Sequence, residues 1–397
     1  MHKTSREQGR LAPVLHLAGA ILSALILIVS VATARADLPV EKQSTRTLPA
    51  KPSPHWVFAN DFAFQNMMDS RAYLIDADAG QVLGLIPTGY FHNALKFPAD
   101  YREIYSVQTY YSRGSRGDRT DVVSIYKPED LSFVEEIVIP AKRMTNTPSL
   151  ANSVLTGDGR FLVIFNMTPA WSATVVDVAN RRVVGEFDTG GCAMLYPSGL
   201  RRLHLLCGDG GLMTVTLDET GGEAGRARIE NFFDAAGDPI LERAVRVGDT
   251  WYFVSYRGVL HPLDASGDAP VAGERWPLVG DADRAASWWI GGSQPLAVHA
   301  SSNTLYALMH QGGPHSHDDP GTEVWTYDLT SRERTGRFLL RQATTTMTVT
   351  ADASPLMLGA SFITAELDVY DAKDGKHLRT VGEVGTTPFL LQVPPQP

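Results

Sequence analysis

The chain has 397 residues, of which 44% are hydrophobic and 20% are charged, as in an ordinary globular protein. Its formal net charge is −9, which argues against nucleic acid as a partner, because phosphate neutralisation needs a basic face. The 35 Gly and 24 Pro are spread along the chain and favour many turns over long helices.

The first 36 residues have the order of a secretory signal peptide. A basic start precedes an apolar stretch at residues 11–32, and Ala34-Arg35-Ala36 has the small-x-small pattern of a cleavage site. The apolar stretch is long enough for an uncleaved membrane anchor, but polar Asp37 follows the site at once and favours cleavage. We therefore expect a mature chain that begins near Asp37 and works in the periplasm.

Two cysteines, Cys192 and Cys207, lie in the part of the chain that is expected to be exported. An oxidising compartment favours a disulfide between them. The alternative is a pair of buried free thiols. The residues around them offer no set of zinc ligands.

One pattern recurs through the mature chain. A short β-prone run ends at or near an acidic or turn residue, and a polar turn and a second β-prone run follow. Seven such runs occur, at residues 73–76, 122–126, 174–177, 213–218, 259–264, 324–328 and 367–371. Their mean spacing is about 49 residues.

A second pattern lies between these copies. A turn of small or acidic residues leads into an apolar strand, most clearly at residues 156–165 and again before residues 104–105, 305–309 and 356–358. Each unit therefore holds about four short strands, which is typical of a β-propeller blade. A single blade cannot bury both of its faces, whereas a closed ring of blades can.

The sequence thus predicts an all-β fold, a seven-bladed β-propeller of four-stranded antiparallel blades at residues 61–397. A β-sandwich would lack the long period, and a doubly wound α/β fold would need regular amphipathic helices. The long step between Asp264 and Asp328 must carry an insertion, with residues 282–287 as the candidate for a short helix. Residues 37–60 contain four prolines and are expected to form an extended arm.

Catalytic motifs are missing from the chain. It has no Gly-x-Ser-x-Gly elbow, no His-Glu-x-x-His and no Walker-type phosphate loop, and Gly208-Asp209-Gly210-Gly211 is interpreted as a blade turn. Adjacent Trp288 and Trp289 could form a ligand platform, but packing in the core is the commoner role. The residue chemistry favours a scaffold or binding protein over a self-sufficient enzyme, and we assign no catalytic residue.

Two polar loops have more than one interpretation. Residues 310–319 contain His310, His315 and His317 with two aspartates, but their spacing matches no common metal site, and a loop that hydrogen-bonds internally is favoured. Residues 112–121 carry Arg113, Arg116 and Arg119. They could form a basic loop that meets an acidic partner, or a hairpin whose arginines pair with nearby carboxylates, and spacing alone favours the hairpin.

Several stretches resemble the heavy chains of methylamine dehydrogenase and aromatic amine dehydrogenase. They span most of the mature chain in the family's order, and the two most specific are the arginine loop from Ser112 to Val123 and the run from Met309 to Trp325. The others are Gly84-x-Ile86-x-x-Gly89, Cys192 with Cys207 before Gly208-Asp209-Gly210, Gly258-x-x-His261-x-Leu263-Asp264, Ala282-Asp283-Arg284-Ala285, Gly291-Gly292 and His299.

The resemblance implies a seven-bladed propeller that assembles as a heterotetramer of two heavy and two light chains. It implies that the cofactor, tryptophan tryptophylquinone, belongs to the light chain, and that this chain binds no cofactor or metal of its own. The complex would oxidise a primary amine to an aldehyde and ammonia. Electrons would pass to amicyanin, azurin or a c-type cytochrome.

The resemblance also assigns candidate positions. Tyr90 and Phe91 fall where the family places an aromatic residue at the substrate channel, although this chain reads Thr88-Gly89-Tyr90-Phe91 in place of Gly-Gly-Phe. A second departure is Trp288-Trp289-Ile290-Gly291-Gly292-Ser293-Gln294 in place of Trp-Arg-Pro-Gly-Gly-Trp-Gln. The candidates for the subunit interface are Arg113, Arg116, Arg119, His310 and His317.

Two other functions remain open from the sequence. One is a non-catalytic periplasmic propeller that binds a ligand or a protein. The other is a pyrroloquinoline-quinone enzyme, a poorer match because such propellers are usually larger and hold their own cofactor.

Overall fold

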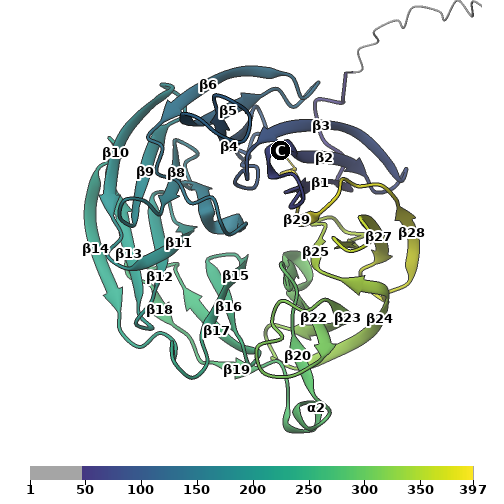
Figure 1. Ribbon diagram of the computed structural model, residues 1–397. Helices are drawn as coiled ribbons and strands as arrows, with labels where there is room; N and C mark the ends of the chain where they lie inside the picture. The colour runs from purple at the N-terminus through teal and green to yellow at the C-terminus, as the bar shows by residue number, and fades with distance from the viewer. Residues whose placement is uncertain (1–46, 397) are drawn as a thin grey trace, which may run out of the picture. The chain divides into compact units, whose positions relative to one another are not determined.

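The computed structural model describes residues 47–396, and the expected signal peptide at residues 1–36 lies outside them. The described chain forms seven antiparallel sheets arranged as a ring around a central axis (Figure 1). This confirms the predicted seven-bladed propeller. Within residues 47–396, no helix is long and apolar enough to cross a membrane.

The blades are numbered here in chain order, and each is given from its innermost strand outwards. Blade 1 consists of β29 (Pro388–Gln392), β1 (Trp56–Asp61), β2 (Ser70–Asp76) and β3 (Gln81–Gly89). Blade 2 consists of β4 (Ile104–Tyr111), β5 (Arg119–Tyr126) and β6 (Phe133–Ile139). Blade 3 consists of β7 (Ser153–Leu155), β8 (Phe161–Asn166), β9 (Ser172–Asp177) and β10 (Arg182–Asp188). Blade 4 consists of β11 (Cys192–Ser198), β12 (Arg202–Cys207), β13 (Leu212–Leu217) and β14 (Glu223–Ile229).

The last three blades follow the same order. Blade 5 consists of β15 (Ile240–Val247), β16 (Thr250–Ser255) and β17 (Val259–Asp264), which pairs with both β18 (Val271–Ala272) and β19 (Trp276–Pro277). Blade 6 consists of β20 (Trp288–Ile290) and β21 (Leu296–His299), both paired with β22 (Thr304–Gln311), then β23 (Gly321–Asp328) and β24 (Arg334–Thr344). Blade 7 consists of β25 (Thr346–Val349), β26 (Leu356–Ser361), β27 (Glu366–Asp371) and β28 (His377–Val381).

Within residues 47–396, helical structure is confined to short connections. The α-helix α2 (Asp281–Ala285) occupies the predicted insertion, and the 3-10 helices are η1 (Met67–Asp69), η2 (Leu150–Asn152) and η3 (Ala300–Ser302). Blade 2 has three strands because its innermost position is taken by an irregular segment. That segment makes isolated bridges from Tyr90 to Thr109 and from Lys96 to Tyr105.

The two sequence patterns correspond to defined strands. The seven repeated runs form the third strand of each blade, which are β2, β5, β9, β13, β17, β23 and β27. The runs that follow a small or acidic turn form second strands, namely β4, β8, β22 and β26. Middle strands are covered by neighbouring blades on both faces, so they are buried along their length and rich in apolar residues. Every residue of β8 and β9 is buried.

The first and last strands of the propeller close the ring. In blade 1, β29 pairs antiparallel with β1, with Phe58 opposite Gln392 and Asn60 opposite Leu390. The arm expected at residues 37–60 is therefore too long, because all of β1 from Trp56 onwards is buried in the propeller. The prolines that suggested an arm end at Pro54, just before this strand.

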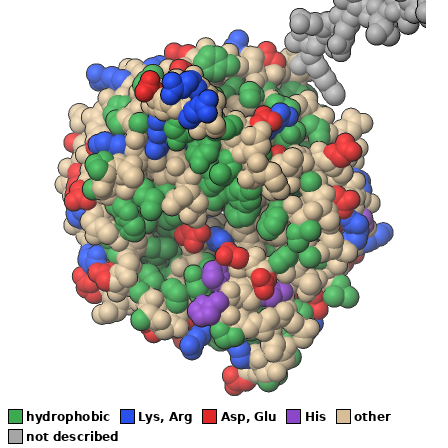
Figure 2. All heavy atoms as spheres, in the orientation of Figure 1, with side chains coloured by type: hydrophobic (Ala, Val, Ile, Leu, Met, Phe, Trp, Pro, Cys, Tyr) green, Lys and Arg blue, Asp and Glu red, His purple; other side chains and the backbone are tan. Residues whose placement is uncertain are grey.

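The antiparallel order gives the propeller two distinct ends. Loops between the second and third strands open at the same end as the connections from each outer strand to the next blade. This end carries residues 62–69, 90–91, 112–118 and 312–320, and we call it the arginine-loop end. In the view of Figure 2, apolar side chains surround the centre, basic ones lie over blade 2 and histidines lie near blades 5 and 6.

Candidate functional site

The candidate residues predicted from the sequence all lie at the arginine-loop end. Tyr90 and Phe91 begin the connection from β3 to β4, and Arg113 and Arg116 lie in the loop from β4 to β5. Arg119 begins β5, while His310 and His317 lie at the end of β22 and in the loop that follows. Seven residues from three segments that are far apart in the sequence therefore share one end of the ring.

Tyr90 and Phe91 differ in burial. Phe91 is 5% exposed, has a φ of +43°, and packs against Phe62 with ring centroids 5.5 Å apart. Tyr90 is half-buried, and its ring meets that of Tyr111 edge-on at 5.7 Å. Phe91 is thus part of the core, whereas Tyr90 lies at the rim with Phe64, which is 38% exposed.

Arg143 fixes the backbone of these two aromatic residues. Its guanidinium is 1% exposed and donates to the carbonyl oxygens of Tyr90 (2.8 Å) and Phe91 (2.9 Å). The same group donates to Thr109 Oγ1 at 2.8 Å, and Thr109 in turn donates to Asp121 at 2.7 Å. Burial lowers the pKa of Arg143 to about 10, while the nearby Asp121 opposes that shift. The positive φ of Phe91 is held by these bonds.

The three arginines of the arginine loop differ in exposure and pairing. Arg119 makes two hydrogen bonds to the buried carboxylate of Asp121, at 2.8 and 2.7 Å, so it is the paired arginine of a hairpin. Arg113 and Arg116 are exposed at the loop tip, and within residues 47–396 neither forms an ion pair. The tip of this loop therefore presents two exposed cations.

The histidine loop is held together by its own contacts. His310 is buried, and its Nε2 lies 2.8 Å from Ser316 Oγ. His317 stacks on Tyr256 at 4.0 Å, and the neighbouring Asp318 accepts a hydrogen bond from Arg243 at 2.8 Å. The Nδ1 atoms of both histidines are buried and lack a hydrogen-bond partner among the described residues. Among residues 47–396 as a whole, no group of three or more His, Cys, Asp or Glu side chains could hold a metal ion.

The adjacent tryptophans serve packing rather than a ligand platform. Trp288 is 8% exposed and lies 5.1 Å from Trp325, ring centre to ring centre. The guanidinium of Arg284, which belongs to α2, lies 4.4 Å from the centre of the Trp289 ring. The insertion helix therefore covers the Trp289 ring.

Cys192 and Cys207 form the predicted disulfide. Cys192 begins β11 and Cys207 ends β12, and the two stand opposite each other in the sheet of blade 4. Their Cα atoms are 3.9 Å apart. The bond thus lies within one blade, on neighbouring strands at the arginine-loop end.

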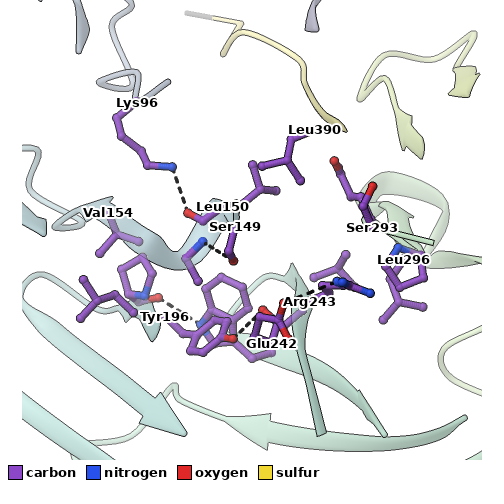
Figure 3. A pocket seen from close by; sticks show the side chains of 18 of the residues that line it. Lys96, Ser149, Leu150, Val154, Tyr196, Glu242, Arg243, Ser293, Leu296 and Leu390 are labelled. Carbon is purple, nitrogen blue, oxygen red and sulfur yellow. Dashed lines mark hydrogen bonds and ion pairs between the residues drawn. The ribbon is translucent and has the colours of Figure 1, made fainter. Parts of the chain in front are cut away.

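A cavity of about 330 Å³ occupies the centre of the ring (Figure 3). Innermost segments from six blades line it, including Lys96, Ser149, Tyr196, Arg243, Ser293 and Leu390. A second cavity of about 340 Å³ shares several of these segments and is lined by later residues of the inner strands, such as Val298 and Val393. The two together follow the axis of the propeller from the arginine-loop end towards the opposite end.

Lys96 and Arg143 could not be identified from the sequence. Each is a basic residue in a connection between blades, and nothing in its neighbours distinguishes it from a solvated surface residue. Their burial results from packing between blades that the local sequence does not encode.

Comparisons with known proteins give the family. Residues 54–393 match the model of the methylamine dehydrogenase heavy chain family. The chain belongs to this family. Its relatives include the methylamine dehydrogenase heavy chain of Methylophilus methylotrophus, 25% identical over 82% of this chain and 80% of the relative. The heavy chain of Paracoccus versutus is 26% identical over 81% of this chain and 75% of the relative.

Solved structures are similar in fold. The dihydro-heme d1 dehydrogenase NirN has a TM-score of 0.57 at 16% identity, over 89% of this chain and 77% of that one. A protein of unknown function from Desulfotomaculum acetoxidans has a TM-score of 0.60 at 11% identity, over 86% of this chain and 100% of that one. At such identities these likenesses concern the propeller alone.

Proposed function

We propose that this chain is the heavy subunit of a periplasmic amine dehydrogenase that oxidises a primary amine to an aldehyde and ammonia. In the assembly, two heavy and two light chains form a heterotetramer. The light chain carries tryptophan tryptophylquinone, which accepts the electrons of the amine. A blue-copper protein, amicyanin or azurin, or a c-type cytochrome then receives them. Family membership supports the heavy-subunit assignment.

The observation that carries the proposal is the gathering of candidate residues at one end of the propeller. Exposed Arg113 and Arg116, the half-buried ring of Tyr90, and the partly exposed Phe64 all lie at the arginine-loop end. Cations beside partly exposed aromatic rings are typical of surfaces that bind other proteins. We infer that the light subunit docks at this end.

Within this proposal, the heavy chain positions groups and performs no chemistry of its own. Arg143 holds the Tyr90–Phe91 backbone, and Phe91 is anchored in the aromatic cluster around Phe62. Tyr90 is therefore presented at the rim on a fixed backbone. There its ring would border the entrance through which the amine reaches the light subunit.

The test is purification of the chain, tagged after Pro397, from the periplasm of the cell that makes it. We expect a small, cysteine-rich partner to copurify, and mass spectrometry to find two cross-linked, oxidised tryptophans in it. N-terminal sequencing of the tagged chain should give a start near Asp37. Cells without the tag provide the control. Recovery of the tagged chain without such a partner would favour a propeller that binds some other ligand or protein.

A further inference from the structure

The central cavity is lined by a lysine, Lys96, whose amine makes a single hydrogen bond. Lys96 is 9% exposed, and its Nζ donates one hydrogen bond, to the carbonyl oxygen of Leu150 at 2.9 Å (Figure 3). An ammonium group has three donors, and within residues 47–396 no carboxylate forms an ion pair with that of Lys96. A buried amine of this kind is costly to keep charged.

Burial therefore changes the chemistry of this amine. It lowers the pKa of Lys96 to about 7, with no opposing contribution from a negative neighbour. The charged groups nearest in the fold include the buried Arg143, which, together with Lys96, further lowers the pKa of His92. Glu242 and Arg243 line the same cavity and lie 3.6 Å apart as a pair of their own. At neutral pH a large fraction of Lys96 is an uncharged nucleophile.

The remaining buried polar groups of the cavity already have partners. Ser149 Oγ accepts from the backbone N–H of Ala151 at 3.1 Å, and the Ser293 hydroxyl lies within 2.9 Å of two carbonyl oxygens. The Gln294 amide bonds both the N–H and the carbonyl of Leu391. The rest of the wall is mostly apolar, with Val154, Leu195 and Leu296 among its members. Apart from its one bond to Leu150, the amine of Lys96 has no partner, and most of the cavity wall beside it is apolar.

We propose that this cavity binds a small apolar aldehyde, held as a reversible imine on Lys96 Nζ. The nitrogen lone pair adds to the carbonyl carbon, and the C=O π pair moves to oxygen, which takes up a proton. The oxygen then leaves as water, which carries away both hydrogens of the neutral amine, and the nitrogen lone pair forms the C=N bond. No oxidant or reductant is consumed.

Size and position both fit this ligand. A cavity of about 150 Å³ can hold benzene, so one of about 330 Å³ has room for an aromatic aldehyde. Arg243 lines the cavity and also reaches Asp318 in the histidine loop, so the cavity begins at the arginine-loop end. An aldehyde is the product of the proposed amine oxidation. The inference rests on the proposed function only in naming that reaction as the source of the aldehyde.

Reductive labelling tests the site on the full mature chain. The chain is incubated at pH 7 with benzaldehyde and cyanoborohydride, which reduces an imine to a stable benzyl amine, and the labelled lysines are found by peptide mapping. An ordinary lysine is about 0.04% neutral at pH 7, and one with a pKa near 7 is about half neutral. Lys96 should therefore be labelled at least tenfold faster than exposed lysines such as Lys127. Equal or slower labelling of Lys96 would overturn the proposal.

Two variants separate the cavity from the amine. Lys96→Arg keeps a cation but cannot form the imine, so the fast label should vanish while the slow surface labels stay. Ala244→Phe fills the cavity wall and leaves Lys96 in place, so labelling of Lys96 should fall about tenfold or more. If Ala244→Phe folds and Lys96 is still labelled rapidly, the aldehyde does not bind in this cavity. The assay involves neither a light subunit nor amine oxidation, so its outcome is independent of the proposed function.

Discussion

His92 shows how burial determines the state of a single residue near the candidate site. Its ring is 1% exposed and stacks on Phe62 at 4.7 Å. Nδ1 lies 2.9 Å from Thr88 Oγ1 and Nε2 lies 3.1 Å from Asn60 Oδ1, an arrangement that suits the neutral ring with its proton on Nε2. Burial, with smaller contributions from Arg143 and Lys96, lowers its pKa to about 3.

This lowered pKa predicts a loss of stability in acid. Below pH 6.5 the unfolded chain takes up a proton on this histidine that the folded chain does not, so stability falls as the pH drops from 6.5 towards 3. Between pH 6 and pH 4 the free energy of unfolding of the natural chain should fall by about 2 kcal/mol more than that of His92→Gln. Urea unfolding at several pH values measures this, and parallel pH profiles for the two proteins would refute it.

Tyr90 is the residue on which substrate preference should depend. It is half-buried at the rim, and its backbone is held by Arg143, so removing its ring changes the entrance without releasing the loop. In the assembled complex, Tyr90→Ala should alter the ranking of amine substrates and leave assembly intact. The measurement is kcat/KM for a series of amines from methylamine to an aromatic amine.

Phe91→Ala is the matched comparison for this variant. Because Phe91 is a core residue, its truncation should lower the free energy of unfolding by about 3–5 kcal/mol. If Tyr90→Ala behaved in the same way, with stability reduced and substrate ranking unchanged, Tyr90 would simply cap blade 1.

At the scale of elements, the arginine loop is the part of the surface most accessible for testing the docking end. Arg113→Glu combined with Arg116→Glu reverses two exposed charges and leaves the Arg119–Asp121 pair in place. We expect slower association with the light subunit, by roughly tenfold at low salt, because rim charges act mainly on the rate of encounter.

Lys373→Glu with Lys376→Glu is the control for this charge reversal. These two lysines lie between β27 and β28, at the end opposite the arginine loop, and their replacement changes the net charge by the same amount. Association rates from surface plasmon resonance should separate the two pairs. Equal slowing by both would mean that only the overall charge matters.

The disulfide joins the first two strands of blade 4. Fourteen residues separate its cysteines, and a loop of that length corresponds to about 3 kcal/mol in the chain-entropy model. Cys192→Ala with Cys207→Ala should therefore unfold at lower urea concentration but keep the same β-rich circular dichroism spectrum. In the unreduced, denatured natural protein, neither thiol should react with iodoacetamide. Alkylation of both would contradict the bond.

At the scale of the whole molecule, the sequence predicted strands according to their position in a blade. Third strands such as β9 and β27 are almost wholly buried, so they appear as short β-prone runs that recur with a regular period. Inner strands such as β15 line the cavity, and their mixed residues, Glu242 and Arg243 among them, give no pattern. The closing strand β1 has no recognisable signal in the sequence, where it follows the prolines of the arm, because its partner, β29, is about 330 residues away.

The site was predictable where family motifs mark it and unpredictable where tertiary packing makes it. The arginine and histidine loops carry specific runs of residues, and the topology places them at one end. Arg143 and Lys96 owe their properties to burial among segments from several blades. A single sequence shows their charge but not the loss of solvent that changes their pKa.

The central claim is that this propeller holds a separate catalytic subunit and is not itself the catalyst. Amine-dependent reduction of an artificial electron acceptor tests it, measured for the purified chain alone, for the copurified small partner alone, and for the two remixed. The chain alone should show neither quinone absorbance nor turnover, and remixing should restore most of the activity of the complex as purified. Amine oxidation by the chain alone would contradict the account, as would full activity of the partner with no contribution from this chain.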